Sequence, residues 1–234
     1  MRMHNVHRQF WTVVLFCALF TSALAAGESV SLFDGKSLDG WEGNAEIWSA
    51  SDGMIVGKTA GIRHNQFLCT TREFQDFELQ LEFRLVNGVG NTGVQIRSER
   101  VPNSTEVSGY QADLGEMFWG GLYDESRRNL VLACPDPVGL RARLDAAGST
   151  MAIQDMTPSP ELDAFRANLK TDGWNTYTIR ADGPRITLRI NGHLTVDYRE
   201  RETEYVKPGV IGLQVHSGGP LEVHFRSLQL TPLD

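Results

Sequence analysis

Three segments of the chain carry polar residues at every second position, with apolar residues between them. The polar members are Gln95 and Arg97 in residues 92–98, Gln111 and Asp113 in residues 109–115, and Gln214 and His216 in residues 210–217. Residues two apart in a strand lie on the same face of a sheet. If the three strands are neighbours, their six polar side chains converge on one surface that offers a base, a cation and amide groups.

Each of these side chains also has a purely structural explanation. Alternating polar residues are typical of the solvated face of an antiparallel sheet, which is what we expect of residues 78–84. Arg97 could pair with Asp113 or Glu99 as a structural ion pair. His216 stands next to a glycine-rich turn and could be a surface residue.

The elements that must position these residues are mostly strands. Residues 77–85 alternate between apolar and polar types, and residues 177–198 read as three strands separated by Asp182-Gly183 and Asn191-Gly192. Such pairs favour tight hairpin turns, so a three-stranded meander is expected. Residues 210–217 and 221–228 alternate again and predict a last hairpin. The 23 glycines and 9 prolines fit many short strands.

One helix is predicted, beginning near Ser159-Pro160 and ending before Asp172-Gly173, because Leu162, Phe165 and Leu169 recur at helical spacing. Residues 135–158 show no period and predict a long excursion between sheets. No linker divides the chain. We therefore expect one all-β domain over residues 26–234, a two-sheet jelly-roll sandwich with one or two short helices.

The N-terminus predicts export. Residues 1–25 combine a basic start, an apolar run over residues 10–20 and small residues at 23–25, which is the pattern of a signal peptide. The expected location is secreted or periplasmic, with no membrane association after the signal is removed. In an oxidising compartment Cys69 and Cys134 could pair, or both could be small buried side chains.

Charge and motif content exclude several classes of function. The net charge of −7 leaves no excess of basic residues for binding nucleic acid. The chain has no zinc-site spacing of cysteines or histidines and no glycine-rich phosphate loop followed by a helix. We expect no nucleotide cofactor. Arg127 and Arg128 closely follow Asp124 and Glu125, which favours a local salt-bridge cluster.

Several blocks resemble a known family. They are Leu32–Trp41, Gly90–Ser98, Gly109–Gly115, Gly121–Asn129, Trp174–Ile179 and Asn191-Gly192, in that order. The chain from Ser31 to its end is similar to the 3-keto-disaccharide hydrolase domain, also described as a 3-keto-glucoside 1,2-lyase or 3-keto-2-hydroxy-glucal hydratase. The resemblance implies a concanavalin A-like jelly roll that acts on sugars. It assigns no catalytic residues, and residues 134–157 depart most from the pattern.

The chemistry implied by the resemblance is an elimination. A ketone at carbon-3 acidifies the proton on carbon-2, so a base can remove it while the group on carbon-1 departs. We expect Asp113 or His216 as the base, Arg97 as the stabiliser of the enolate, and Glu125 or Tyr123 as the acid. Substrate-binding candidates are Gln95, Gln111 and Gln214, with Trp119 and Tyr123 to stack on a pyranose ring.

Two further possibilities stay open. A divalent cation held by Asp113, Glu116, Asp124 or His216 could share the enolate role, although no ligand spacing demands one. A partner oxidoreductase could supply the ketone. The alternatives to this enzyme are a noncatalytic lectin-like module on the same sandwich and a conventional hydrolase with paired carboxylates.

Overall fold

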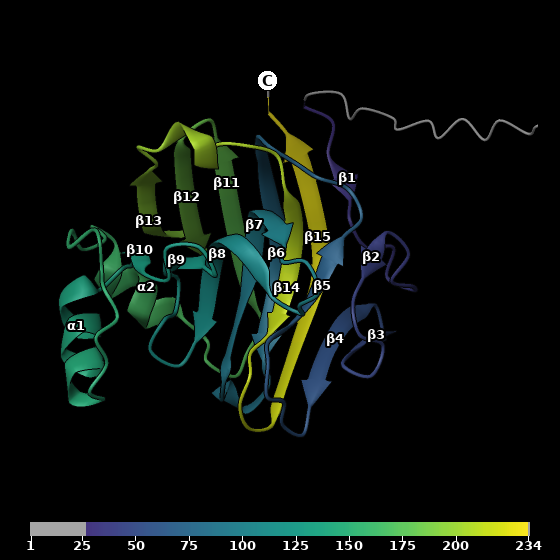
Figure 1. The fold of residues 1–234 in the computed structure, drawn as a ribbon, viewed down its shortest axis with the longest axis horizontal. Coiled ribbons are helices and arrows are strands. Elements are labelled where there is room, and N and C mark those ends of the chain that lie inside the picture. The colour runs from purple at the N-terminus through teal and green to yellow at the C-terminus, as the bar shows by residue number, and fades with distance from the viewer. Residues whose placement is uncertain (1–26, 234) are drawn as a thin grey trace, which may run out of the picture.

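The computed structural model describes residues 27–233 and shows two antiparallel sheets packed face to face (Figure 1). Sheet A has the strand order β13 (His193–Arg199), β12 (Arg185–Ile190), β11 (Asn175–Asp182), β6 (Phe77–Leu85), β15 (Leu221–Pro232), β4 (Met54–Thr59) and β3 (Trp48–Ser51), with β1 (Val30–Ser31) paired to β15. Sheet B has the order β10 (Val131–Ala133), β9 (Leu122–Glu125), β8 (Val107–Gly115), β7 (Asn91–Arg100), β14 (Val210–Val215), β5 (Gln66–Thr70) and β2 (Trp41–Glu42). The predicted all-β sandwich is confirmed.

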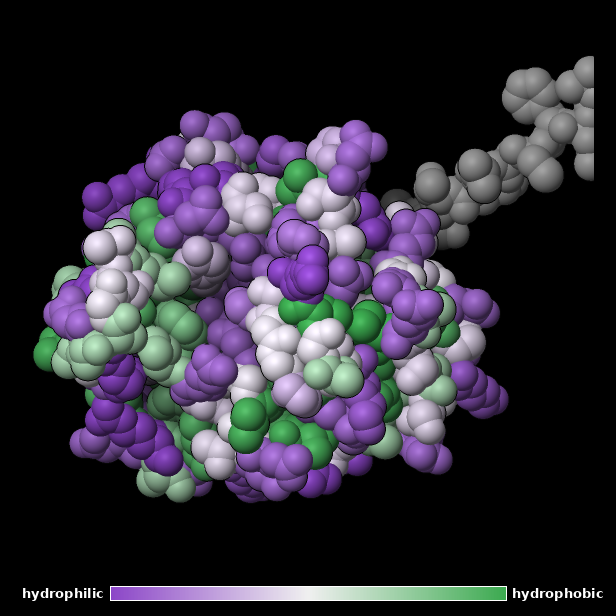
Figure 2. All heavy atoms as spheres, turned by 60° about the horizontal axis from the view of Figure 1, so that its bottom comes forward, coloured by the Kyte–Doolittle hydropathy of each residue, from purple (hydrophilic) through white to green (hydrophobic). Residues whose placement is uncertain are grey.

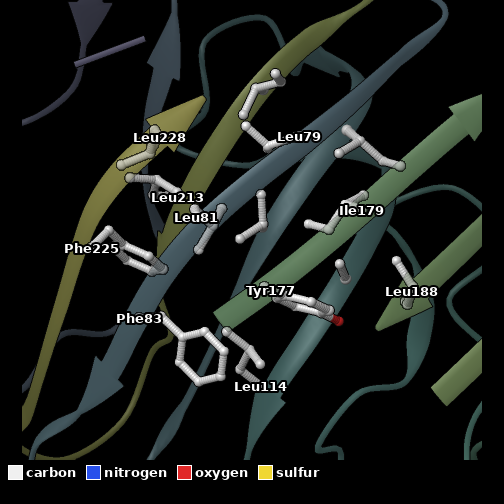
Figure 3. Close-up of a cluster of buried hydrophobic side chains, with 14 of the residues drawn as sticks. Leu79, Leu81, Phe83, Leu114, Tyr177, Ile179, Leu188, Leu213, Phe225 and Leu228 are labelled. Atoms are coloured by element: carbon white, nitrogen blue, oxygen red, sulfur yellow. The ribbon is translucent and has the colours of Figure 1, made fainter. Parts of the chain in front are cut away.

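The core lies between the sheets and follows the alternation read from the sequence. In β6, Leu79, Leu81 and Phe83 are buried and face the inner side chains of sheet B, such as Leu114 and Leu213 (Figure 3). Burying a side chain of this size stabilises the fold by about 1.5–3 kcal/mol. The predicted solvated face of β6 is also present, because its polar residues point away from this core.

The meander is confirmed, but the predicted last hairpin is wrong. β11, β12 and β13 pair in sequence order through the two expected turns. β14, however, pairs with β5 and β7 in sheet B, whereas β15 pairs with β4 and β6 in sheet A. Gly218-Gly219-Pro220 therefore carries the chain from one sheet to the other. Adjacent alternating segments look the same in sequence whether they pair with each other or cross the core.

Two helices lie beside the strands at one edge of the sandwich. The predicted helix is present as α2 (Leu162–Asn168), which buries Phe165; it begins later than expected, after Glu161. The structure adds α1 (Pro137–Ala146) in the stretch expected to be aperiodic. The Asp136 carboxylate caps α1 by accepting a hydrogen bond from the Gly139 N–H, and Pro137 stands in the first turn. Short 3₁₀ turns occur at Val86–Gly88 and Thr203–Tyr205.

Both cysteines are buried free thiols. Cys69 lies on β5, whereas Cys134 packs near α1, so the possible disulfide is wrong and the alternative of two small buried side chains holds. The predicted signal peptide lies outside the described residues. Within residues 27–233 no helix has the length and apolar character needed to cross a bilayer.

Candidate active site

Three glutamines from the central strands of sheet B form a buried hydrogen-bonded chain, which we call the glutamine ladder. Gln95 on β7 donates from Nε2 to Oε1 of Gln111 on β8 at 2.8 Å, and Gln111 donates from Nε2 to Oε1 of Gln214 on β14, also at 2.8 Å. The Ser98 hydroxyl lies 2.7 Å from Oε1 of Gln95 at the other end. The order β8-β7-β14 makes these strands neighbours, as the sequence required.

Gly93 makes the ladder possible. Gln111 lies on β8 and Gln214 on β14, so the amide bridge between them must cross β7. It crosses at Gly93, where a Cβ atom would stand 2.5 Å from Nε2 of Gln111 and 2.7 Å from its Cγ. The Gln111 side chain therefore occupies the space that a side chain at position 93 would need.

The ladder ends in an unused donor. Gln214 is completely buried, and its Nε2 has no hydrogen-bond partner within residues 27–233. A buried amide without a partner costs about 1–3 kcal/mol, which a bound oxygen atom would recover. The ladder therefore leaves this donor free for an oxygen atom that can reach it.

Asp113 lies on the same face, two residues after Gln111 along β8. The residues on either side of Asp113, Ala112 and Leu114, belong to the core. The carboxyl accepts a hydrogen bond from the Leu114 N–H at 3.1 Å and interacts with the Asn91 side chain. Burial, followed by the nearby charge of Glu125, raises the pKa of Asp113 well above its ordinary value. Asp113 therefore favours the neutral, proton-carrying form.

Glu125 is a second carboxyl on this face, on β9. Burial, followed by the charge of Glu106, raises the pKa of Glu125 to about 7. Glu106 is held in place by Asn65, whose Nδ2 donates to Oε2 of Glu106 at 3.2 Å and whose Oδ1 accepts from the Ser217 N–H at 2.8 Å. A carboxyl with a pKa near neutrality can both take up and release a proton at physiological pH.

The remaining predicted residues occupy different places. Tyr123 pairs directly with Gln111 across β8 and β9, and burial raises the pKa of its hydroxyl to about 12. His216 follows β14, and its Nδ1 lies 2.7 Å from the Ser217 carbonyl oxygen, so Nδ1 carries a proton and donates it to that oxygen. Trp119 instead packs against Phe83, with ring centroids 6.2 Å apart, and lines a separate cavity beside α1 and α2.

The predicted placement of Arg97 is wrong. The pairing of β7 with β8 shifts between Ile96 and Glu99, and Arg97 has a φ of 47°, so the alternation of faces breaks at this residue. Its guanidinium donates to the carbonyl oxygens of Gln75 and Gly183 and pairs with Asp76. Arg97 is a buried structural link between the two sheets and lies away from the ladder.

The predicted salt-bridge cluster around Asp124 is present. Both carboxylate oxygens of Asp124 are bonded, one to Arg127 at 2.7 Å and the other to Arg128. Arg128 also bonds Glu200 at 2.6 Å, which in turn accepts from the Tyr110 hydroxyl at 2.7 Å. Because Asp124 is occupied in this way, it cannot join Asp113 as a metal ligand. Among residues 27–233 no three metal-binding side chains gather at one point.

The site includes residues that the sequence did not single out. Asn91 and Ser98 lie on β7 at the two ends of the polar face, while Asn65 and Glu106 come from loops outside any alternating segment. Asn91 is four residues from Gln95 on the same strand, so the alternation of faces could have placed it on this polar face. The residues around Glu106, in contrast, do not indicate that it approaches Glu125. Figure 2 shows that the molecule is hollowed beside the lobe that carries α1 and that the floor of the hollow is hydrophilic.

Comparisons with known proteins find a matching family and matching folds. Residues 28–231 match the family described as the 3-keto-alpha-glucoside-1,2-lyase-like domain. No curated protein matches the chain. Solved structures with the same fold include a protein from Parabacteroides distasonis provisionally described as a glycosyl hydrolase, at 17% identity and a TM-score of 0.59, covering 88% of this chain and 94% of that one.

Two Bacillus subtilis proteins also share the fold. One is a protein of unknown function with a galectin-like fold, at 11% identity and a TM-score of 0.58, covering 90% of this chain and 97% of that one. The other is the carbohydrate-binding module CBM66, at 15% identity and a TM-score of 0.54, covering 81% and 94%. At these identities the likeness concerns the fold, which serves both enzymes and binding modules.

Proposed function

Because the chain belongs to the 3-keto-alpha-glucoside-1,2-lyase-like family, a carbohydrate-related family, we propose that it cleaves the glycosidic bond of 3-keto-glycosides by elimination. The observation that carries the proposal is that Asp113 and Glu125 share one polar face with Gln111, whose hydrogen-bond partner Gln214 has an unpartnered amide nitrogen. Elimination needs a base, an acid and a donor for the enolate oxygen, and this face offers all three.

We assign Glu125 as the base and Asp113 as the acid. Glu125, with its pKa of about 7, takes the proton from carbon-2 of the sugar, and the electron pair forms the enolate with the carbon-3 ketone. The enolate then expels the oxygen on carbon-1, leaving a double bond between carbon-1 and carbon-2. Asp113 gives its proton to the departing oxygen. The same groups can add water to that double bond, which is the hydratase direction.

The enolate oxygen takes its hydrogen bonds from amides rather than from a guanidinium. Arg97 was expected in this role, but it is committed to Asp76 and two carbonyl groups. The N–H of Gln214 is the buried donor that remains, and the ladder holds its orientation. A fixed donor of this kind costs no reorganisation as negative charge develops. In this proposal Tyr123, which pairs with Gln111, contacts the sugar ring.

The test is turnover of a purified 3-keto-glycoside, followed by identification of the product. We expect release of the aglycone together with an unsaturated 3-keto sugar or its hydrate. Glu125→Gln and Asp113→Asn should each lower kcat by about 10²-fold or more, the ordinary contribution of one acid or base. Glu78→Gln on the outer face of β6 is the matched control and should leave kcat unchanged.

A noncatalytic sugar-binding module is the second candidate, favoured by the likeness to CBM66. Saturable binding of the 3-keto-glycoside without any released aglycone would establish that role and refute the elimination. Cleavage of an unoxidised disaccharide at a similar rate would instead support a conventional hydrolase.

A further inference from the structure

A cavity of about 380 Å³ lies at the edge of the sandwich, between the 116–119 turn, α1 and α2. None of the ladder residues lines it, and neither does Asp113 or Glu125. Its size is within the range of small-molecule sites in proteins. The cavity is therefore a second concave feature, separate from the candidate active site.

The walls of the cavity are largely aromatic and aliphatic. Trp119 is one wall and is supported from the core by Phe83. The other apolar lining residues are Met117, Phe118, Pro135, Leu140, Leu162, Phe165 and Leu169. Burial raises the pKa of the Cys134 thiol to about 12, so this lining group is neutral as well. Walls of this composition suit a flat apolar ring.

The polar groups of the cavity are balanced in charge. Arg143 and Arg166 both approach Oδ2 of Asp136, at 3.5 and 2.5 Å, and about half of each arginine side chain is exposed. The same Asp136 carboxylate caps α1 through its other oxygen. Glu116 is the second acidic lining residue, so the lining includes two guanidinium groups and two carboxylates. An ionic ligand would upset this balance.

We propose that this cavity binds a neutral phenol of one or two rings. The aromatic body fits between Trp119 and the side chains of α1 and α2. A phenolic hydroxyl both donates and accepts hydrogen bonds. It can therefore donate to the Asp136 carboxylate and accept from the Arg143 or Arg166 guanidinium. The inference does not depend on the proposed reaction, because it uses a different set of side chains.

Backbone hydrogen bonds connect Asp113 to the turn that forms one side of the cavity. The Gly120 N–H donates to the Asp113 carbonyl at 3.0 Å, and the Asp113 N–H donates to the Gly121 carbonyl at 2.8 Å. The turn that carries Trp119 is thus bonded directly to the strand that carries Asp113. A ligand in the cavity can therefore affect the active site, so its binding should be measured without sugar substrate.

The test is titration of the full chain with 2-naphthol by calorimetry. We expect saturable binding with one site per chain, and binding at least about tenfold weaker for the anion 2-naphthoate and for the saturated ring alcohol. Leu169→Trp fills the cavity and should abolish binding. Leu38→Trp replaces a partly buried leucine that does not line the cavity and should leave binding unchanged. Absence of saturable binding, or equal binding to Leu169→Trp, would overturn the proposal.

A second variant keeps the test decisive if Leu169→Trp does not fold. Glu116→Gln changes one exposed lining residue and leaves an excess positive charge at the cavity. We expect the affinity for 2-naphthol to stay within about twofold and the affinity for 2-naphthoate to rise severalfold. Tighter binding of 2-naphthoate than of 2-naphthol to the unaltered protein would instead identify an anion site and refute the phenol.

Discussion

The glutamine ladder can be tested through the one residue that makes room for it. In Gly93→Ala the new methyl group would stand 2.5 Å from Nε2 of Gln111 and 2.7 Å from its Cγ, so the Gln111 side chain must move. Moving it breaks the hydrogen bonds to Gln95 and to Gln214, both of which are completely buried.

The expected cost follows from those two bonds. Each buried polar group left without a partner costs about 1–3 kcal/mol, and replacing glycine by alanine recovers about 0.4–1 kcal/mol through the unfolded state. We therefore expect Gly93→Ala to lower the free energy of unfolding by about 2–4 kcal/mol. The measurement is urea denaturation, in which the midpoint should fall while the slope m stays unchanged.

Two controls separate the ladder from a general effect of the substitution. Gly219→Ala adds the same methyl group where no atom lies within 4 Å, so its free energy of unfolding should equal or slightly exceed that of the unaltered protein. In a Gln111→Ala background, Gly93→Ala should cost less than about 0.5 kcal/mol, because no side chain remains to be displaced. If Gly93→Ala behaves like Gly219→Ala, the reasoning about the ladder is refuted.

Three further predictions concern single side chains. Arg97→Met should lower the free energy of unfolding by about 3 kcal/mol, because Asp76 and two carbonyl groups lose their donor. A loss of activity at an unchanged urea midpoint would contradict this structural role. Tyr177→Phe should raise the stability by about 1 kcal/mol, because the buried Tyr177 hydroxyl in Figure 3 has no partner within residues 27–233; a lower melting temperature would count against this. The pKa of Glu125 is raised from 4.5 to about 7, so the folded state holds this proton more tightly than the unfolded state. The free energy of unfolding should therefore fall as pH rises from about 4.5 to about 7. Glu125→Gln should flatten that part of the stability profile, and an unchanged profile would show that Glu125 does not titrate there.

Much of the fold could be predicted because it depends on local alternation. The strand at 77–85 and the meander were readable from period-2 patterns and from Asp-Gly and Asn-Gly turns. The order of strands was not, since the β14 and β15 segments look like a hairpin but lie in opposite sheets. Helix α1 was missed although its buried residues, Pro137, Leu140 and Leu144, have the same spacing as Leu162, Phe165 and Leu169. That spacing, with Asp136 and Pro137 at its start, was a usable signal.

The candidate site could be predicted wherever polar and apolar residues alternate regularly along a strand. Gln95, Gln111, Asp113 and Gln214 lie on one face, as their parity requires. Arg97 does not, because a bulge changes the parity within a strand and leaves no clear mark in the residue types. Glu106 could not be found from its own segment, since it reaches the site through a loop anchored by Asn65. Long-range contacts of this kind depend on the packing of the whole domain.

The central claim is that the glycosidic bond breaks through removal of the carbon-2 proton, and the most direct test is to label that position. A 3-keto-glycoside carrying deuterium at carbon-2 should release its aglycone more slowly than the unlabelled compound, and the sugar product should have lost the deuterium to water. A sugar product that keeps its deuterium, formed at the unlabelled rate, would contradict the mechanism.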